Sequence, residues 1–320
     1  MTDRLTGDRY VNPYTDFGFK MLFGTEMNKE LLISFVNSLF DGKEVITDLT
    51  YLNTEQLGTA ETDRKAVFDV YCENEKGEKI LIEMQRGEQQ FFKDRSVYYS
   101  TFPIREQGRK GEWNYELKAV YVIGILNFTF YDEDSEYFHH EVKLVDINTK
   151  EVFYDKLTFM YLEMPKFNKT ENELEDMFDK WMFVLRNLSR LMGRPAALQE
   201  RVFTKLFEAA EIAKFSKQQY DEYEESLKAY RDWQNTIETA KMRSREEGRA
   251  EGIEVGRAEG IEVGRAEGIE VGRAEGIEAG RAEGRKLERI EMARKFKASG
   301  IPADIIARNT GLSEKEISDL

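Results

Sequence analysis

Residues 65–85 read KAVFDVYCENEKGEKILIEMQ, and this stretch decides the fold. Two runs that favour strands, 65–75 and 79–85, flank a polar turn that contains Lys76 and Gly77, which predicts a β-hairpin. Because side chains alternate between the two faces of a strand, each strand is expected to have one apolar and one polar face. The expected apolar face carries Phe68, Val70, Cys72, Ile80, Ile82 and Met84, and the expected polar face carries Lys65, Asp69, Tyr71, Leu81, Glu83 and Gln85.

Asp69 and Glu83 are expected to face each other across this hairpin. A turn centred near Lys76 pairs them directly, with Cβ atoms about 5 Å apart. Two carboxylates this close repel unless a positive charge lies between them, and a divalent cation with oxygen ligands meets that need. Magnesium is the expected ion for phosphodiester chemistry, with manganese and calcium as alternatives. Taken alone, the pair is better explained as solvated carboxylates on an edge hairpin, because exposed carboxylates are ordinary.

The runs on either side of the hairpin predict an α/β fold. Residues 28–40 have apolar side chains at helical spacing and end at Asp41 and Gly42, which form a stop signal. Residues 117–130 are almost continuously apolar, which is typical of a central strand covered on both faces. The other expected elements are a loop at 12–15, strands at 47–56, 141–145 and 156–163, and helices at 91–107 and 171–191.

Composition excludes several kinds of site. The net charge of -14 argues against a protein that coats nucleic acid through bulk charge, so any DNA-binding surface must be local. The two histidines, His139 and His140, are adjacent and would face opposite sides of a strand, so zinc chemistry is not expected. The single cysteine, Cys72, is expected in the core. No apolar run is long enough to span a membrane and no secretory signal is evident, so a soluble cytoplasmic protein is expected.

The hairpin resembles the signature of the PD-(D/E)XK nucleases, in which an aspartate lies on one strand and Glu-x-Lys on the next. The surrounding residues are more similar still to the Rpn family of recombination-promoting nucleases and transposases. The likeness extends to the apolar strand that follows Leu117. It rests on NPYTDFGFKMLFG at 12–24, DRKAVFD at 63–69, IEMQ at 82–85 and FKDRSVYY at 92–99.

This resemblance implies a restriction-endonuclease-like core that acts as a metal-dependent DNA endonuclease. Asp69 and Glu83 would hold the cation, which would polarise the scissile phosphate and supply the attacking water. DNA is the implied partner, and promotion of DNA recombination is the implied role.

Gln85 stands where the broader superfamily has lysine. Glutamine can orient a water or a phosphate oxygen but carries no charge, and a plain surface role is the alternative. Asp16 is a candidate further metal ligand or a helix cap. Tyr99 is a candidate hydrogen-bonding group near the site or a packing residue. Three residues are candidates for the missing cation: Lys65, Lys20 and Arg95. For Arg95 the alternative is a packing or salt-bridge role.

The chain changes character near residue 197 and becomes charged and helix-favouring. From Gly248 the octad GRAEGIEV occurs three times, then once with Ala279 in place of valine. In a straight helix each octad is rotated by roughly 80° relative to the one before it, so the apolar side chains of successive octads do not line up on one face. Glycine at every fourth position costs about 1 kcal/mol against alanine, so an isolated helix would be marginal. A spacer or assembly arm is expected, and through it a homo-oligomer.

The last residues are similar to a small helix-turn-helix. Gly300 ends one helix, Pro302 opens another, and 313–316 form a capping box before the last helix. That helix is acidic and offers only Lys315 to a phosphate, which favours a folding or oligomerising cap over sequence-specific DNA reading.

The expected organisation is a nuclease-like domain at 1–195, a helical arm at 196–247, octad repeats at 248–285 and a small helical tail at 286–320. The alternative to an endonuclease is a catalytically silent binding or assembly protein that keeps the nuclease fold. A transposase with three carboxylates on an RNase-H-like fold fits worse, because nothing in the helical arm singles out a third acid.

Overall fold

A computed structural model describes residues 8–56, 66–108, 114–130 and 137–320. The chain divides into two compact units, Met1–Asn235 and Thr236–Leu320. No helix among the described residues is long and apolar enough to cross a membrane.

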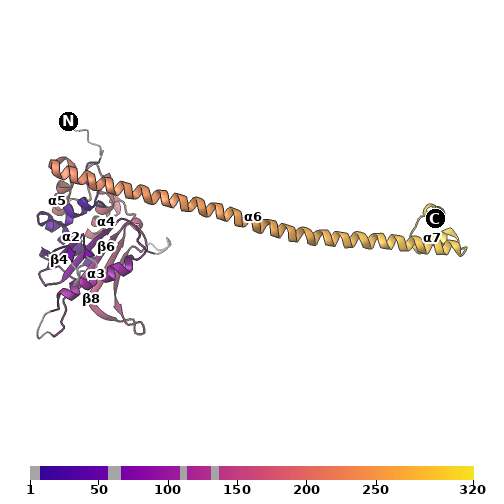
Figure 1. The fold of residues 1–320 in the computed structure, drawn as a ribbon, viewed down its shortest axis with the longest axis horizontal. Coiled ribbons are helices and arrows are strands. Elements are labelled where there is room, and N and C mark those ends of the chain that lie inside the picture. Colours follow the sequence, from indigo (N-terminus) through magenta and orange to yellow (C-terminus); the bar gives the residue numbers. More distant parts are fainter. Residues whose placement is uncertain (1–7, 57–65, 109–113, 131–136) are drawn as a thin grey trace. The chain divides into compact units, whose positions relative to one another are not determined.

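A six-stranded mixed sheet forms the centre of the first unit, in the order β1-β4-β5-β6-β8-β7 (Figure 1). The first three strands are antiparallel, β5, β6 and β8 run parallel, and β7 returns antiparallel at the edge. A short two-stranded sheet pairs β2 with β3. The strands are β1 (Leu49–Tyr51), β2 (Glu55–Gln56), β3 (Ala66–Val67), β4 (Val70–Asn74), β5 (Lys79–Gln85), β6 (Val120–Leu126), β7 (His139–Val145) and β8 (Val152–Glu163).

Helices cover both faces of this sheet, which confirms the α/β class. The larger core lies on the face covered by α1, α2, α4, α5 and the beginning of α6. On the opposite face α3 covers a smaller core. The helices of this unit are α1 (Asp16–Phe23), α2 (Lys29–Phe40), α3 (Phe92–Glu106), α4 (Met177–Asn187) and α5 (Arg201–Ala210), followed by α6 (Lys217–Ala298), which continues into the second unit.

The second face of the hairpin is buried, which corrects the expectation of a polar face. Tyr71 and Leu81 are almost inaccessible and pack in the α3 core with Phe92 and Phe102. The reason is nonlocal: α3 lies on this side of the sheet. Among the described residues of this face, Asp69, Glu83 and Gln85, at the end of the hairpin away from its turn, keep the polar character expected there.

Helix α1 was not expected from the sequence. Thr15 caps it, because the threonine hydroxyl accepts a hydrogen bond from the Gly18 amide at 3.0 Å. The same hydroxyl donates to the Asn12 carbonyl at 2.7 Å. Asp16 therefore lies in the first turn and is not the cap, which corrects that reading of Asp16.

The first compact unit runs to Asn235, well past the compositional change near residue 197. Phe203 and Leu206 of α5 are fully buried in the larger core. Tyr223 and Tyr230 of α6 join them, so the first turns of the charged segment are part of this fold.

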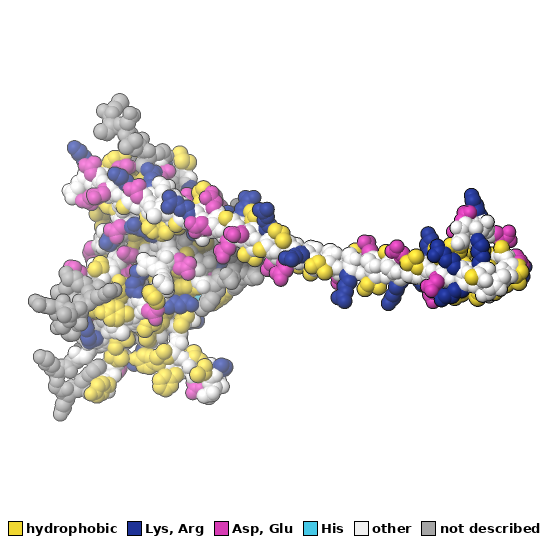
Figure 2. Space-filling view, turned by 45° about the vertical axis from the view of Figure 1, so that its right-hand side comes forward, with side chains coloured by type: hydrophobic (Ala, Val, Ile, Leu, Met, Phe, Trp, Pro, Cys, Tyr) yellow, Lys and Arg dark blue, Asp and Glu magenta, His cyan; other side chains and the backbone are white. Residues whose placement is uncertain are grey.

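In the second unit α6 remains helical through the octad repeats. The repeat glycines have open space around them, and the isoleucines between them, such as Ile253 and Ile261, are exposed. Basic, acidic and apolar side chains are interspersed along this segment with bare backbone between them (Figure 2). The repeats thus have no buried face within the described chain.

The tail packs α7 (Ala303–Thr310) and α8 (Glu314–Ser318) against the last turns of α6. A small cluster built from Ala293, Ile306 and Ile317 holds these three helices together. Gly300 and Gly311 both have positive φ, which glycine tolerates at helix ends, and Ser313 forms the expected capping box. The predicted helix boundaries in the tail are confirmed.

Candidate active site

The two carboxylates meet where β4 and β5 separate. Val70 pairs with Ile82, so the predicted hairpin register is confirmed. At the next position the Asp69 carboxylate accepts a hydrogen bond from the Met84 amide at 2.7 Å. The Asp69 amide in turn donates to Glu83 Oε1 at 3.4 Å. The backbone of β5 therefore fixes the Asp69 side chain beside Glu83.

Regular alternation ends at this point, which corrects the predicted face of Phe68. Phe68 lies in the α3 core, with Tyr71 and Tyr99, instead of sharing a face with Val70. The physical reason is that β4 begins only at Val70 and Asp69 lies in a bend. The bend frees the aspartate side chain to bind the neighbouring strand's backbone.

Burial changes the protonation of both acids. Burial raises the pKa of Asp69, and the nearby Asp16 charge adds to the rise, although the Met84 hydrogen bond, Lys20 and Arg86 oppose it. Burial likewise raises the pKa of Glu83 to about 8, with the Asp69 charge as the next cause. In the absence of a cation, the pair therefore holds a proton more tightly than two isolated carboxylates would.

The donor chemistry of this pair fits magnesium. Asp69 and Glu83 would supply two carboxylates, and among the described residues no group of three or more His, Cys, Asp or Glu side chains is placed to hold a metal. Magnesium is commonly held by one or two carboxylates, with waters and substrate phosphates completing its octahedron. Two buried acids with raised pKa values are what a divalent cation would neutralise.

Gln85 links Glu83 to a cation on α3. The buried amide of Gln85 donates from Nε2 to Glu83 Oε2 at 3.0 Å. Arg95 donates from its guanidinium to Gln85 Oε1 at 2.5 Å, and its charge opposes the rise in the Glu83 pKa. A surface role for Gln85 is thereby ruled out, and Arg95 lies near the acids as one of the predicted cations.

Tyr99 lies beside the same residues. It lines a small cavity together with Glu83, Arg95 and Gly124. Burial raises the pKa of Tyr99, and the Glu83 charge adds to the rise, so its hydroxyl stays protonated near the acids. The sequence analysis placed Tyr99 near the site, where it lies, and its hydrogen-bonding role stays a prediction.

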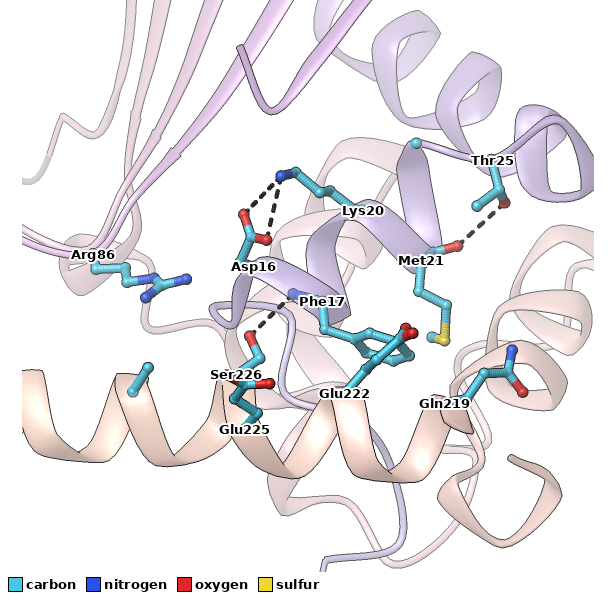
Figure 3. Close-up of a pocket in the computed structure, with 12 residues that line it drawn as sticks. Asp16, Phe17, Lys20, Met21, Thr25, Arg86, Gln219, Glu222, Glu225 and Ser226 are labelled. Atoms are coloured by element: carbon cyan, nitrogen blue, oxygen red, sulfur yellow. Dashed lines mark hydrogen bonds and ion pairs between the residues drawn. The ribbon is translucent and has the colours of Figure 1, made fainter. Parts of the chain in front are cut away.

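A groove of about 690 Å³ runs between α1 and the first turns of α6 (Figure 3). Asp16 and Lys20 line it and form an ion pair at 3.0 Å. Arg86 extends from the end of β5 toward Asp16. We call this the α1 groove. It brings two cations, Lys20 and Arg86, into electrostatic range of Asp69.

Arg86 was missed by the sequence analysis, because it follows the last residue of β5 and its direction depends on where the chain leaves the sheet. Its neighbour Gly87 packs closely against α6. A Cβ there would lie 2.3 Å from the Trp233 ring of α6, so a glycine is needed for close packing. Lys65, the remaining candidate cation, lies outside the described residues.

For the nuclease activity that the resemblance implies, we expect Gln85→Lys to fold and to keep plasmid cleavage within about tenfold of wild type, a change of roughly 1.4 kcal/mol in the barrier. The lysine would restore the commoner superfamily residue, and its charge would lower the pKa of Glu83. Initial rates of plasmid nicking across pH measure both effects, with Gln85→Met as the uncharged control. Complete loss of cleavage with normal metal binding would show that the amide does something a cation cannot replace.

Comparison with known proteins identifies the family of the chain. A family model described as PD-(D/E)XK nuclease family transposase matches residues 13–240. No curated protein and no solved structure matches. The matched range includes α1, the hairpin with Asp69 and Glu83, α3, and the part of α6 that belongs to the first unit. The chain therefore belongs to the PD-(D/E)XK nuclease family transposases.

Proposed function

We propose that the protein is a metal-dependent DNA endonuclease that hydrolyses phosphodiester bonds and thereby promotes recombination. The observation that carries the proposal is the buried pair of Asp69 and Glu83, whose pKa values are both raised. Two ionised carboxylates at this spacing repel each other, which favours a bound cation, and their position on the hairpin is the one that the resemblance to the PD-(D/E)XK signature implies.

Each group has a distinct role in this proposal. Asp69 and Glu83 would hold a divalent cation, which supplies a Lewis acid and lowers the pKa of a bound water. The Gln85 amide keeps Glu83 oriented through its hydrogen bond and connects it to Arg95. The Arg95 guanidinium would stabilise charge that develops on the phosphate. Lys20 and Arg86 are placed to bind a neighbouring phosphate from the α1 groove.

Incubation of the full chain with supercoiled plasmid tests the activity. With Mg²⁺ or Mn²⁺ we expect nicked or linear product, and with EDTA none. Ca²⁺ is expected to bind without supporting the same rate, because it tolerates looser geometry than magnesium. DNA binding without cleavage under every metal condition would favour the catalytically silent binding or assembly protein instead.

We propose further that the octad repeats set the reach or assembly of the protein and take no part in cleavage. Each repeat offers one arginine and two glutamates on a rotating surface, which cannot build a defined pocket. Deletion of residues 256–271 removes two octads and, in a helix, about 24 Å of length.

We expect the shortened chain to cleave short duplexes at the wild-type rate and to show altered sedimentation or altered action on long DNA. Parallel assays on short and long duplexes, with sedimentation velocity, measure these effects. Loss of short-duplex cleavage, with normal melting of the first unit, would place the repeats in the active site and refute this division of roles.

A further inference from the structure

A second groove lies along α3, on the Glu83 side of the carboxylate pair. It has a volume of about 510 Å³, and we call it the α3 groove. Its wall is a row of residues on one side of the helix, because positions 91, 95, 98 and 99 are separated by about one and two helical turns. The lining residues are Gln89, Gln90, Phe91, Asp94, Arg95, Tyr98 and Tyr99.

Two aromatic side chains in this groove are exposed to solvent. Phe91 is 64% exposed and Tyr98 is 44% exposed. Phe91 immediately precedes α3, where no core requires an aromatic ring. Exposed apolar side chains that gather around a polar group are typical of a binding surface.

The groove shares two lining residues with the small cavity of the candidate active site. Arg95 and Tyr99 line the α3 groove and also line the small cavity that contains Glu83. The Arg95 guanidinium lies 5.7 Å from the centre of the Tyr99 ring, and it also binds Gln85. A group that enters the groove therefore touches the same arginine that acts on Glu83.

The chemistry of the lining favours a nucleobase over a phosphate. Aromatic rings and a guanidinium offer flat surfaces for stacking, while Gln90 and Asp94 offer hydrogen-bonding groups suited to base edges. Asp94 would repel a phosphate but can accept a hydrogen bond from a base amino group. In a fully paired duplex, neighbouring bases cover the faces that would stack, so only an unstacked base can enter.

We propose that the α3 groove binds an unpaired nucleobase of the strand that is cut. The inference rests on the proposed nuclease function and adds its substrate class: DNA with at least one unpaired or extruded nucleotide next to the scissile phosphate. Phe91 and Tyr98 supply the stacking surfaces, and Arg95 connects the bound base to the carboxylate pair.

The test measures binding of a single-stranded oligodeoxynucleotide that contains 2-aminopurine, in EDTA so that no cleavage occurs. Stacking on the protein quenches the fluorescence of this base. We expect Phe91→Ala to weaken binding about tenfold and to reduce the quenching, since stacking on one aromatic side chain contributes roughly that much. Phe91→Trp should restore both. Phe153→Ala, at a phenylalanine of β8 that is 79% exposed, is the matched control and should bind as wild type does.

Unchanged affinity and quenching in Phe91→Ala would overturn the proposal. So would a dimer that dissociates in Phe91→Ala while oligonucleotide binding is unaffected, because the groove would then bind a second copy of the chain. The outcome is separable from that of the proposed function. If the wild-type protein does not cut plasmid and Phe91→Ala weakens oligonucleotide binding, the base site exists without the nuclease activity. If the wild-type protein cuts plasmid and Phe91→Ala binds the oligonucleotide unchanged, the nuclease activity exists without the base site.

Discussion

Replacing Asp69 with asparagine is expected to abolish DNA cleavage, with a loss of about a thousandfold or more in rate. A metal that polarises a phosphate contributes several kcal/mol to the barrier, and each 1.4 kcal/mol changes a rate about tenfold. Asparagine keeps an oxygen that can accept the Met84 hydrogen bond, so the hairpin should remain folded. Nicking of supercoiled plasmid in Mg²⁺ measures the rate, and circular dichroism checks the fold.

Glu83→Gln should behave in the same way, because it removes the second charge and keeps the side-chain shape. Asp155→Asn is the matched control, since Asp155 is an exposed carboxylate on β8. Cleavage at the wild-type rate by both active-site variants would exclude Asp69 and Glu83 as the metal ligands.

Gly18→Ala is expected to destabilise the first unit by about 3 kcal/mol, the upper part of the range for overpacking a buried position. A Cβ on Gly18 would lie 2.2 Å from the Asn12 carbonyl oxygen and 2.7 Å from the Thr15 hydroxyl. Neither can move freely, because Thr15 caps α1 and the Asn12 amide binds the Tyr223 hydroxyl at 3.0 Å.

Differential scanning calorimetry of the full chain measures the effect, and we expect the Tm of the first unit to fall by roughly 6–12 °C. Gly252→Ala is the control, because a Cβ there meets nothing within 4 Å. That change should leave the first unit unaffected and should favour the repeat helix by about 1 kcal/mol. A wild-type Tm for Gly18→Ala would mean that the turn before α1 is not packed as described.

The hairpin was predictable because its information is local. A two-residue period and a polar turn near Gly77 set the register, and the register brings Asp69 opposite Glu83. The likeness of the flanking segments to a nuclease family then gave these acids a function. Gln85 and Arg95 could be chosen as candidates in the same way, but their hydrogen bond could not be foreseen.

Features that depend on distant segments were not predictable. The burial of Tyr71 and Leu81 depends on α3, which lies on one face of the sheet. The role of Arg86 depends on where β5 ends and on the packing of Trp233 against Gly87. The alternation of apolar and polar residues within the hairpin carries no information about either contact.

Helix α1 illustrates a different limit. Its eight residues, DFGFKMLF, are rich in aromatics and contain a glycine, so local helix propensity is weak. The helix is held by its Thr15 cap and by packing of Phe19 and Phe23 in the larger core. Tertiary contacts thus decide its conformation, and with it the placement of Asp16 and Lys20.

The raised pKa of Glu83 has a consequence for stability. Its ordinary pKa is 4.5 and its pKa in the folded, metal-free chain is about 8, so the folded state binds the proton more tightly. The stabilisation of the folded state that comes from this tighter proton binding is complete below about pH 4.5, and it is lost as the pH rises through about 8. We therefore expect the metal-free protein to lose stability over this interval and bound magnesium to restore it.

Calorimetric titration of the metal-free chain with Mg²⁺, in buffers of different ionisation enthalpy, tests the central claim most directly. If Asp69 and Glu83 jointly hold the cation, wild-type protein will bind Mg²⁺ with release of a proton at neutral pH, and its affinity will rise as the pH approaches about 8. Glu83→Gln will lose both the binding and the proton release. Equal Mg²⁺ affinity and equal proton release in wild type and Glu83→Gln would contradict the account.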